Sequence, residues 1–544
     1  MKKLALLLVL LLAFGVFSAA MAQSEGLGVV STAFGDVSGV FENGVTYYKG
    51  VPYAAPPVGD LRWAPPQDPE AWEGVLPCDT YAPMAMQILS TTDFWGDEFY
   101  YDWMDEYPPM SEDCLYLNVV TPATSSDDGY PVYVWFHGGA GMHGYSWEPE
   151  FEPSELVKKG VIVVSVGYRL GLFGYMALEE LSAASETGTS GNYGLLDQIK
   201  SLEWVQQNIA AFGGDPSRVT IGGQSAGAGA VAAILTSPLS KGLVSGAIMD
   251  SSFSAFTSSV TSMEQMYENC NKYLDEKGYG EMTLEELRAL PTSAFINETT
   301  EKPEIYGKGF GRCLDGWAMT ESPAEFYLRE GSLEGINILY GSNSGEGNGS
   351  FSISTQADIF EAAKTTYGDL YDKYNFEQLY KGKDDIGATL ESLRLRSQKT
   401  GTQGIITAEV LSQVQPESDF YVYYFDHWTP GREEEIRWSW HSGELWYAFA
   451  SLRDIPEQRD WEDLDYEVAD KYSSYWANFI ATGNPNGPNV PYWPSADLDN
   501  PVLMNMGDTF FLRSDFYGGT KLADRDALMR ESIITSYDLG KYFE

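Results

Sequence analysis

A serine surrounded by small residues follows a short apolar run near the middle of the chain. Ser225 is the central residue of the motif GQSAG (223–227), which comes directly after Val219-Thr220-Ile221. The pattern predicts a strand that turns sharply into a helix and presents the serine hydroxyl at the apex of the turn. Because the chain contains 55 glycines, Gly-x-Ser-x-Gly also arises by chance. The assignment therefore needs a base and an acid at compatible positions.

The base is sought among only four histidines. On a sheet that carries this kind of turn, the reactive residues follow in the order Ser, acid, His, which excludes the two histidines that precede Ser225. His427 closes the apolar run 420–425 and is expected to be a structural residue at the end of a buried strand. His441 lies in a loop ahead of a predicted helix, where a reactive imidazole is well presented. We therefore predict His441 as the base.

Glu346 is the predicted acid. It is the only carboxylate in the loop 341–347, which follows the apolar segment 336–340. An isolated glutamate in a turn is usually exposed to solvent, so the assignment depends on the chain order Ser225, Glu346, His441. In that order, His441 would take the proton of Ser225 during attack on an ester carbonyl, and Glu346 would orient the imidazole.

The oxyanion formed by such an attack needs backbone N–H donors. Ala226 is expected to supply one, and the glycine-rich segment 137–141, after the predicted strand 132–136, is expected to supply the others.

The glycines of this segment also fit a second pattern. Gly139, Gly141 and Gly144 spell Gly-x-Gly-x-x-Gly, as in dinucleotide-binding loops, but the next predicted strand ends without the acidic residue that such loops require. We therefore expect no nicotinamide and no other cofactor.

The elements that must position these residues alternate between apolar strands and helical stretches. This alternation predicts an α/β fold, a mostly parallel central sheet with helices on both faces. Two polar, helical regions near 251–335 and 357–414 are expected to be cap insertions over the site, within a single catalytic domain spanning 23–544. The six strands predicted for the sheet are 132–136, 161–166, 219–221, 244–249, 336–340 and 420–425.

Residues 1–22 have the composition of a bacterial signal peptide. Lys2 and Lys3 precede the apolar segment 4–17, and Ala20-Met21-Ala22 fits a small-x-small cleavage site. We expect a mature chain that begins at Gln23 and is secreted or periplasmic. An uncleaved membrane anchor is the alternative, because the segment 4–22 is nearly long enough to span a bilayer.

The charge balance restricts the partners. The chain has 78 acidic and 34 basic residues and a net charge of −44, and loss of Lys2 and Lys3 with the leader makes it more negative by two. Such a surface repels nucleic acids and anionic membranes, so neither is expected as a partner. We interpret the acidic surplus as a solubilising surface, with adaptation to salty surroundings or a preference for cationic substrates as the alternatives. It does not imply disorder, because the 44% hydrophobic content is enough to bury a large core. The oligomeric state stays open.

Several further blocks resemble the type-B carboxylesterases, the family that includes the cholinesterases, from about Gly28 to the C-terminal region. The resemblance implies an α/β-hydrolase fold and hydrolysis of small-molecule carboxylic esters. It identifies Ser225, Glu346 and His441 as the triad, and Gly139 and Ala140, with Ala226, as the oxyanion-hole donors. The blocks are GVPYAAPP (50–57), LRW (61–63), SEDCLYLNV (111–119), GNYGLLDQ (191–198) and FGGDP (212–216).

Three positions depart from the family pattern. Ala140 stands where the family usually has glycine, so its methyl group predicts poor tolerance for esters of bulky tertiary alcohols. Gln224 replaces the glutamate of cholinesterases, which argues against specificity for choline esters. Gly345 stands where the family often has aspartate, next to the predicted acid.

The four cysteines fit an oxidising compartment and allow three pairings. The resemblance favours bridges from Cys78 to Cys114 and from Cys270 to Cys313. Free buried thiols are one alternative. A metal site is not expected, because no Cys-x-x-Cys or His pair occurs at ligand spacing.

Two functions follow as hypotheses. The favoured one is a secreted serine carboxylesterase that forms an acyl-enzyme on Ser225. The other is a binding or adhesion protein on the same fold, because members of this superfamily that lack triad residues serve as interaction domains. The presence of Ser225, Glu346 and His441 favours the enzyme.

Overall fold

A computed structural model describes residues 26–88, 94, 108–296, 309–431, 433–452 and 459–544. The leader lies outside these residues, so the signal peptide and its cleavage stay predictions. Within the described part of the chain, no helix is both long enough and apolar enough to cross a membrane.

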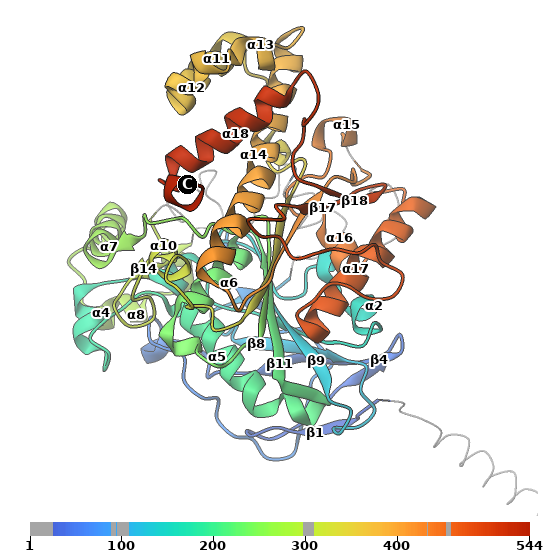
Figure 1. Cartoon of the computed structure of the whole chain (residues 1–544). Helices are drawn as coiled ribbons and strands as arrows, with labels where there is room; N and C mark the ends of the chain where they lie inside the picture. The colour runs from blue at the N-terminus through green and yellow to red at the C-terminus, as the bar shows by residue number, and fades with distance from the viewer. Residues whose placement is uncertain (1–25, 89–93, 95–107, 297–308, 432, 453–458) are drawn as a thin grey trace, which may run out of the picture.

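An 11-stranded sheet forms the centre of the molecule, in the order β18-β17-β16-β15-β12-β11-β9-β10-β8-β4-β3 (Figure 1). The seven strands from β17 to β10 pair in parallel, and antiparallel strands complete both edges. The strands are β3 (Val40–Glu42), β4 (Val45–Pro52), β8 (Tyr116–Thr121), β9 (Tyr130–Phe136), β10 (Ile162–Val166), β11 (Gly214–Gln224), β12 (Gly246–Asp250), β15 (Asn337–Asn343), β16 (Phe420–Phe425), β17 (Leu503–Met506) and β18 (Phe510–Arg513).

All six predicted strands are confirmed, and they lie side by side as β16-β15-β12-β11-β9-β10. The α/β fold class is therefore confirmed. The largest difference in bounds is at β11, which begins at Gly214 and has a register shift before Val219. The irregular segment 215–218 is polar, so the apolar pattern alone did not reveal the start of this strand.

Helices cover both faces, and the alternation of side chains along β9 shows how. Val132, Val134 and Phe136 pack in one core cluster, with α5 (Tyr193–Asn208), α6 (Ala226–Thr236) and α14 (Asp385–Val414). Tyr133 and Trp135 pack in the other, with α16 (Leu445–Ala448) and α17 (Asp463–Thr482). In Figure 1, α5 and α6 accordingly lie on one side of the sheet and α17 on the other.

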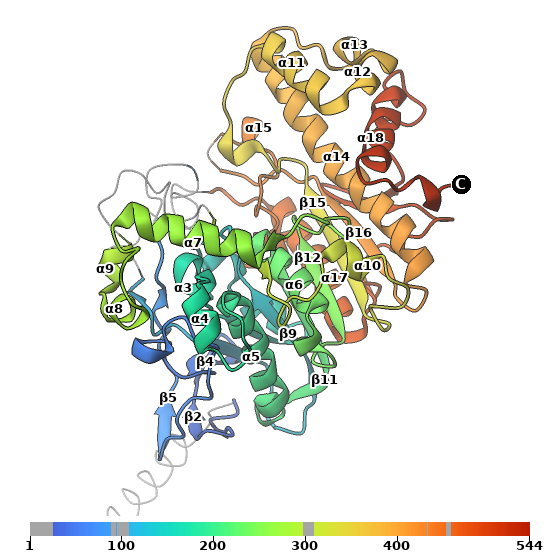
Figure 2. The ribbon, with the colours of Figure 1, turned by 90° about the vertical axis from the view of Figure 1, so that its left-hand side faces the viewer.

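Both regions predicted as cap insertions are helical. The first contains α7 (Met263–Lys277), α8 (Leu284–Ala289), α9 (Thr292–Phe295) and α10 (Pro323–Tyr327). The second contains α11 (Gln356–Tyr367), α12 (Asp369–Lys373) and α13 (Phe376–Tyr380), which gather at one end of α14 (Figure 2). α14 itself contacts β15 and β16 directly, so much of this helix covers the sheet. The division into one domain with two caps stays a prediction.

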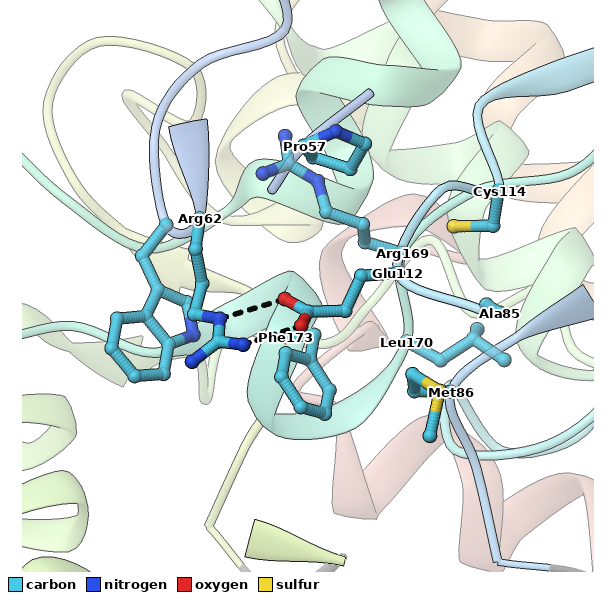
Figure 3. Close-up of a pocket in the computed structure, with 10 residues that line it drawn as sticks. Pro57, Arg62, Ala85, Met86, Glu112, Cys114, Arg169, Leu170 and Phe173 are labelled. Atoms are coloured by element: carbon cyan, nitrogen blue, oxygen red, sulfur yellow. Dashed lines mark hydrogen bonds and ion pairs between the residues drawn. The ribbon is translucent and has the colours of Figure 1, made fainter. Parts of the chain in front are cut away.

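Two ion pairs are buried in the protein. Arg169 and Asp197 lie 2.7 Å apart with side chains that are 3% and 0% exposed. Arg62 and Glu112 lie 2.5 Å apart, and Figure 3 shows the Arg62 guanidinium facing the Glu112 carboxylate next to the ring of Phe173. One nitrogen of Arg62 also donates to backbone carbonyls of residues 287, 288 and 290. The pair therefore fixes the α8 segment against the N-terminal part of the chain.

Loss of the Asp197 charge should destabilise the protein strongly. In Asp197→Asn, Arg169 keeps its charge in a dry environment without an ionic partner, which costs about 3–5 kcal/mol. The midpoint of guanidinium unfolding should fall accordingly. Glu334→Gln is the matched control, because the Lys241–Glu334 pair is exposed and should contribute less than about 1 kcal/mol. A decrease as small as that of the control would contradict this prediction.

Candidate active site

Ser225 occupies the sharp turn between β11 and α6. Its backbone has φ 56° and ψ −120°, a conformation that costs an L residue about 1–3 kcal/mol. Two backbone hydrogen bonds hold the turn: Ser225 N–H donates to the carbonyl of Asp250 at 2.9 Å, and Gly229 N–H donates to the carbonyl of Ser225 at 3.0 Å. The predicted strand, turn and helix, with the serine at the apex, are thus present.

Two glycines allow α6 to lie directly against the neighbouring strand β9. A Cβ atom added at Gly227 would lie 2.1 Å from the carbonyl oxygen of Phe136, and one at Gly223 would lie 2.4 Å from the backbone of Gly227. Side chains at either position would push the helix away from the sheet. The glycines of the motif therefore set the position of Ser225 through backbone packing.

Glu346 follows the end of β15, and His441 lies in the loop after β16. The fold brings these two side chains together. His441 Nδ1 lies 2.5 Å from Glu346 Oε2, and the side chains are 23% and 12% exposed. The other carboxylate oxygen of Glu346 accepts a hydrogen bond from the N–H of Asn343 at 2.8 Å. Gly345 allows this arrangement, because a Cβ there would lie 2.3 Å from the carbonyl oxygen of Arg437.

The other ring nitrogen of His441 faces the sharp turn at Ser225, which we call the elbow. His441 Nε2 lies 3.3 Å from the side-chain nitrogen of Gln224, the residue before Ser225. Because Nδ1 faces a carboxylate, it carries the proton of the neutral imidazole, and Nε2 accepts from the Gln224 amide. The structure thus joins Glu346 to His441 and His441 to the neighbour of Ser225. No direct hydrogen bond links the Ser225 hydroxyl to His441, and such contacts often tighten only when substrate binds.

The predicted oxyanion loop lies beside the elbow. A Cβ added at Gly138 would lie 3.4 Å from Cβ of Ser225 and 3.0 Å from the Gln224 carbonyl oxygen. Gly139, Ala140 and Gly141 follow with φ angles of 91°, 58° and 71°. The left-handed conformation costs Ala140 about 1–2 kcal/mol relative to glycine. Gly138, directly before Gly139 and Ala140, therefore lies next to Ser225. The role of Gly139, Ala140 and Ala226 as donors stays a prediction.

Two further carboxyl groups lie near Glu346, and the sequence analysis missed them. Glu444 is fully buried, accepts a hydrogen bond from the Asn343 side-chain amide, and accepts another from the Ser251 hydroxyl at 3.2 Å. Asp250 ends β12 and accepts a hydrogen bond from the Tyr423 hydroxyl at 2.9 Å. The sequence signal for Glu444 was its position three residues after His441, immediately before α16.

Burial decides the charge of these two groups. Burial, together with repulsion from Glu346, raises the pKa of Glu444 to about 7. Burial and the charges of Glu444 and Glu346 raise the pKa of Asp250 well above its ordinary value. Burial alone would lower the pKa of His441, but the charge and hydrogen bond of Glu346, with a contribution from Glu444, raise it. The site thus stabilises a protonated imidazole next to Glu346.

The remaining predicted residues lie elsewhere. His427 contacts Asp465 at 2.9 Å and Asp508 at 2.7 Å, so it is a structural residue after β16, as predicted. All four cysteines are buried thiols, and neither predicted bridge is formed. The Cys313 thiol contacts the Met263 sulfur at 3.4 Å. The pairings of Cys78 with Cys114 and of Cys270 with Cys313 stay predictions for the oxidised protein.

Known proteins resemble this chain over most of its length. The sequence model of the Carboxylesterase family matches residues 27–517. A para-nitrobenzyl esterase from Bacillus subtilis (strain 168) is 34% identical, covering 86% of this chain and 92% of that protein. A fumonisin B1 esterase from Sphingopyxis macrogoltabida is 32% identical, covering 87% and 85%. A solved structure of a PNB esterase has a TM-score of 0.73 at 29% identity and covers 93% of this chain and 100% of its own. The chain therefore belongs to the carboxylesterase family and is a carboxylic ester hydrolase.

Proposed function

We propose that this hydrolase is an exported enzyme that cleaves small carboxylic esters through an acyl-enzyme on Ser225. The observation that carries the proposal is the chain of contacts from Glu346 through His441 to Gln224, which ends beside a strained serine. Export rests on the leader 1–22, whose composition fits a cleaved signal peptide.

The chemistry follows from where charge develops. His441 Nε2 leaves the Gln224 amide and takes the proton of the Ser225 hydroxyl as its oxygen attacks the ester carbonyl. Glu346 keeps the Nδ1 proton in place and stabilises the imidazolium. The imidazolium then gives its proton to the departing alcohol, and water repeats the sequence on the acyl-enzyme.

The negative charge on the former carbonyl oxygen is the second requirement. N–H groups of Gly139, Ala140 and Ala226 are the proposed donors, and the N-terminus of α6 adds a favourable dipole. Losing one such donor typically lowers the rate by about two to three orders of magnitude.

Ser225→Ala tests the proposal directly. Hydrolysis of 4-nitrophenyl butyrate should fall by at least about four orders of magnitude, whereas Ser217→Ala, at an exposed position in β11, should retain wild-type activity. A fluorophosphonate should label the peptide containing Ser225 in the wild type and in the control. Activity retained without Ser225, or labelling at another residue, would refute the acyl-enzyme on this serine.

Gln224→Glu tests His441 as the base. A carboxylate next to Nε2 stabilises the imidazolium and should raise the pKa of His441 further. Because catalysis requires neutral His441, the acidic limb of the kcat/KM profile should move to higher pH. The uncharged variant Gln224→Met should leave that limb in place. If the acidic limb of the kcat/KM profile were the same in the wild type, Gln224→Glu and Gln224→Met, another group would be the base.

Glu444→Gln tests the buried acid. The carboxyl retains its proton up to about pH 7 when folded but loses it from about pH 4.5 when unfolded. Its contribution to stability is therefore complete below pH 4.5 and lost as pH rises to 7. Glutamine has no such proton, so the decrease in unfolding free energy between pH 5 and pH 8 should shrink by about 3 kcal/mol. The exposed control Glu186→Gln should keep the wild-type slope, and equal slopes for all three would contradict a neutral Glu444.

A further inference from the structure

The short strand β14 (Cys313–Leu314) lies on the side of the sheet that carries α6 (Figure 1). Arg312 immediately precedes this strand. The backbone at its C-terminal side is fixed, because Cys313 N–H donates to the Asn192 side chain at 3.0 Å and the Asn192 amide donates to the Cys313 carbonyl at 2.8 Å. The Arg312 side chain therefore extends from a fixed point.

The Arg312 guanidinium packs against the first turns of α6. A Cβ added at Gly229 would lie 2.8 Å from Nη2 of Arg312 and 3.9 Å from its central carbon. Gly229 N–H is bonded to the carbonyl of Ser225. Since four residues make about one helical turn of 5.4 Å and share a face of the helix, the guanidinium lies about one turn from the proposed nucleophile.

The same cation borders the residues that hold the oxyanion loop. Burial raises the pKa of the Tyr175 hydroxyl, and the charge and a hydrogen bond of Arg312 oppose that shift. The hydroxyl of Tyr168, whose pKa Arg312 also influences, donates to the carbonyl of His137 at 2.7 Å. Arg312 thus lies near α6 and close enough to Tyr175 and Tyr168 to influence their hydroxyl groups.

Arg312 forms no ion pair with any described residue, although the chain has 78 carboxylates for 34 basic residues. Arg62, Arg169 and Arg525, by contrast, each contact a carboxylate. A half-buried guanidinium without an anionic partner can still bind one, because its planar fork matches a carboxylate.

We propose that Arg312 binds a free carboxylate of the substrate, so that the enzyme prefers esters carrying a carboxylate about four to six bonds from the reacting carbonyl. This inference rests on the proposed acyl-enzyme at Ser225. The bond that breaks is still the ester C–O bond, and the second carboxylate takes no part in it beyond binding. Arg312 is therefore a specificity-determining residue.

The test compares matched charged and neutral esters. On the acid side the pair is the mono-4-nitrophenyl ester of adipic acid and 4-nitrophenyl 6-oxoheptanoate, in which a methyl ketone replaces the carboxylate. On the alcohol side the pair is 4-(butyryloxy)benzoate and 4-acetylphenyl butyrate. The proteins are wild type, Arg312→Gln, Arg312→Lys and the control Arg218→Gln, which removes a surface arginine at the opposite end of β11.

For Arg312→Gln we expect kcat/KM on one of the two anionic esters to fall about 10- to 100-fold, mainly through KM, as for loss of one charge-assisted hydrogen-bonded pair. Activity on both neutral esters should change less than about threefold. Arg312→Lys should retain part of the preference, and Arg218→Gln all of it. The anionic ester that responds identifies whether the carboxylate belongs to the acid or to the alcohol.

An equal effect on charged and neutral esters in both Arg312 variants, with unchanged thermal unfolding, would overturn the inference and leave Arg312 a packing residue. Failure of the proposed function would give a result that is distinguishable from failure of the Arg312 inference. In that case the wild type itself would not cleave the neutral esters, and a fluorophosphonate would not label Ser225.

Discussion

The close backbone contact between β9 and α6 is the constraint on which the site depends. β9 and β11 pair in parallel up to Phe136 and Gly223, and α6 then starts so near the sheet that Gly227 touches the Phe136 carbonyl. As a result the elbow and the segment 138–141 leave adjacent strands at the same edge and remain side by side. Ser225, the proposed nucleophile, and the proposed amide donors are therefore positioned by contacts of the main chain.

The carboxyl ends of β12 and β15 reach the same edge of the sheet, and this arrangement brings several carboxylates close together. Asp250, Glu346 and Glu444 lie close enough to influence one another, and three charges in a dry region would repel strongly. Burial and this repulsion raise the pKa of both Asp250 and Glu444, which favours their protonated forms. Glu346, which contacts the imidazole, is thus left to stabilise it.

Sequence reasoning located the strands and selected three candidate reactive residues, two of which the fold brings into contact, because each had a strong local signal. The apolar runs of β9, β10 and β16 are uninterrupted, and Ser225, Glu346 and His441 follow the order that the fold imposes. Glu444 and Asp250 had no such signal, since a carboxylate before a helix or at the end of a strand is usually solvated. Their burial depends on Tyr423, Asn343 and Ser251, which only the folded chain brings together. Whether the thiols form bridges depends on redox conditions that a sequence does not encode.

The glycines around Ser225 are needed for two different reasons: some avoid a clash with backbone, and one leaves room for a side chain. Added atoms at Gly223 and Gly227 would meet backbone, which cannot move without separating α6 from the sheet. An added atom at Gly229 would meet only the Arg312 side chain, so the turn itself does not require glycine there. The space at Gly229 accommodates the Arg312 guanidinium instead.

The strongly acidic surface of the protein repels anions at long range, but salt screens this repulsion beyond about 10 Å. A substrate carboxylate that has entered the site therefore interacts mainly with the nearby cation.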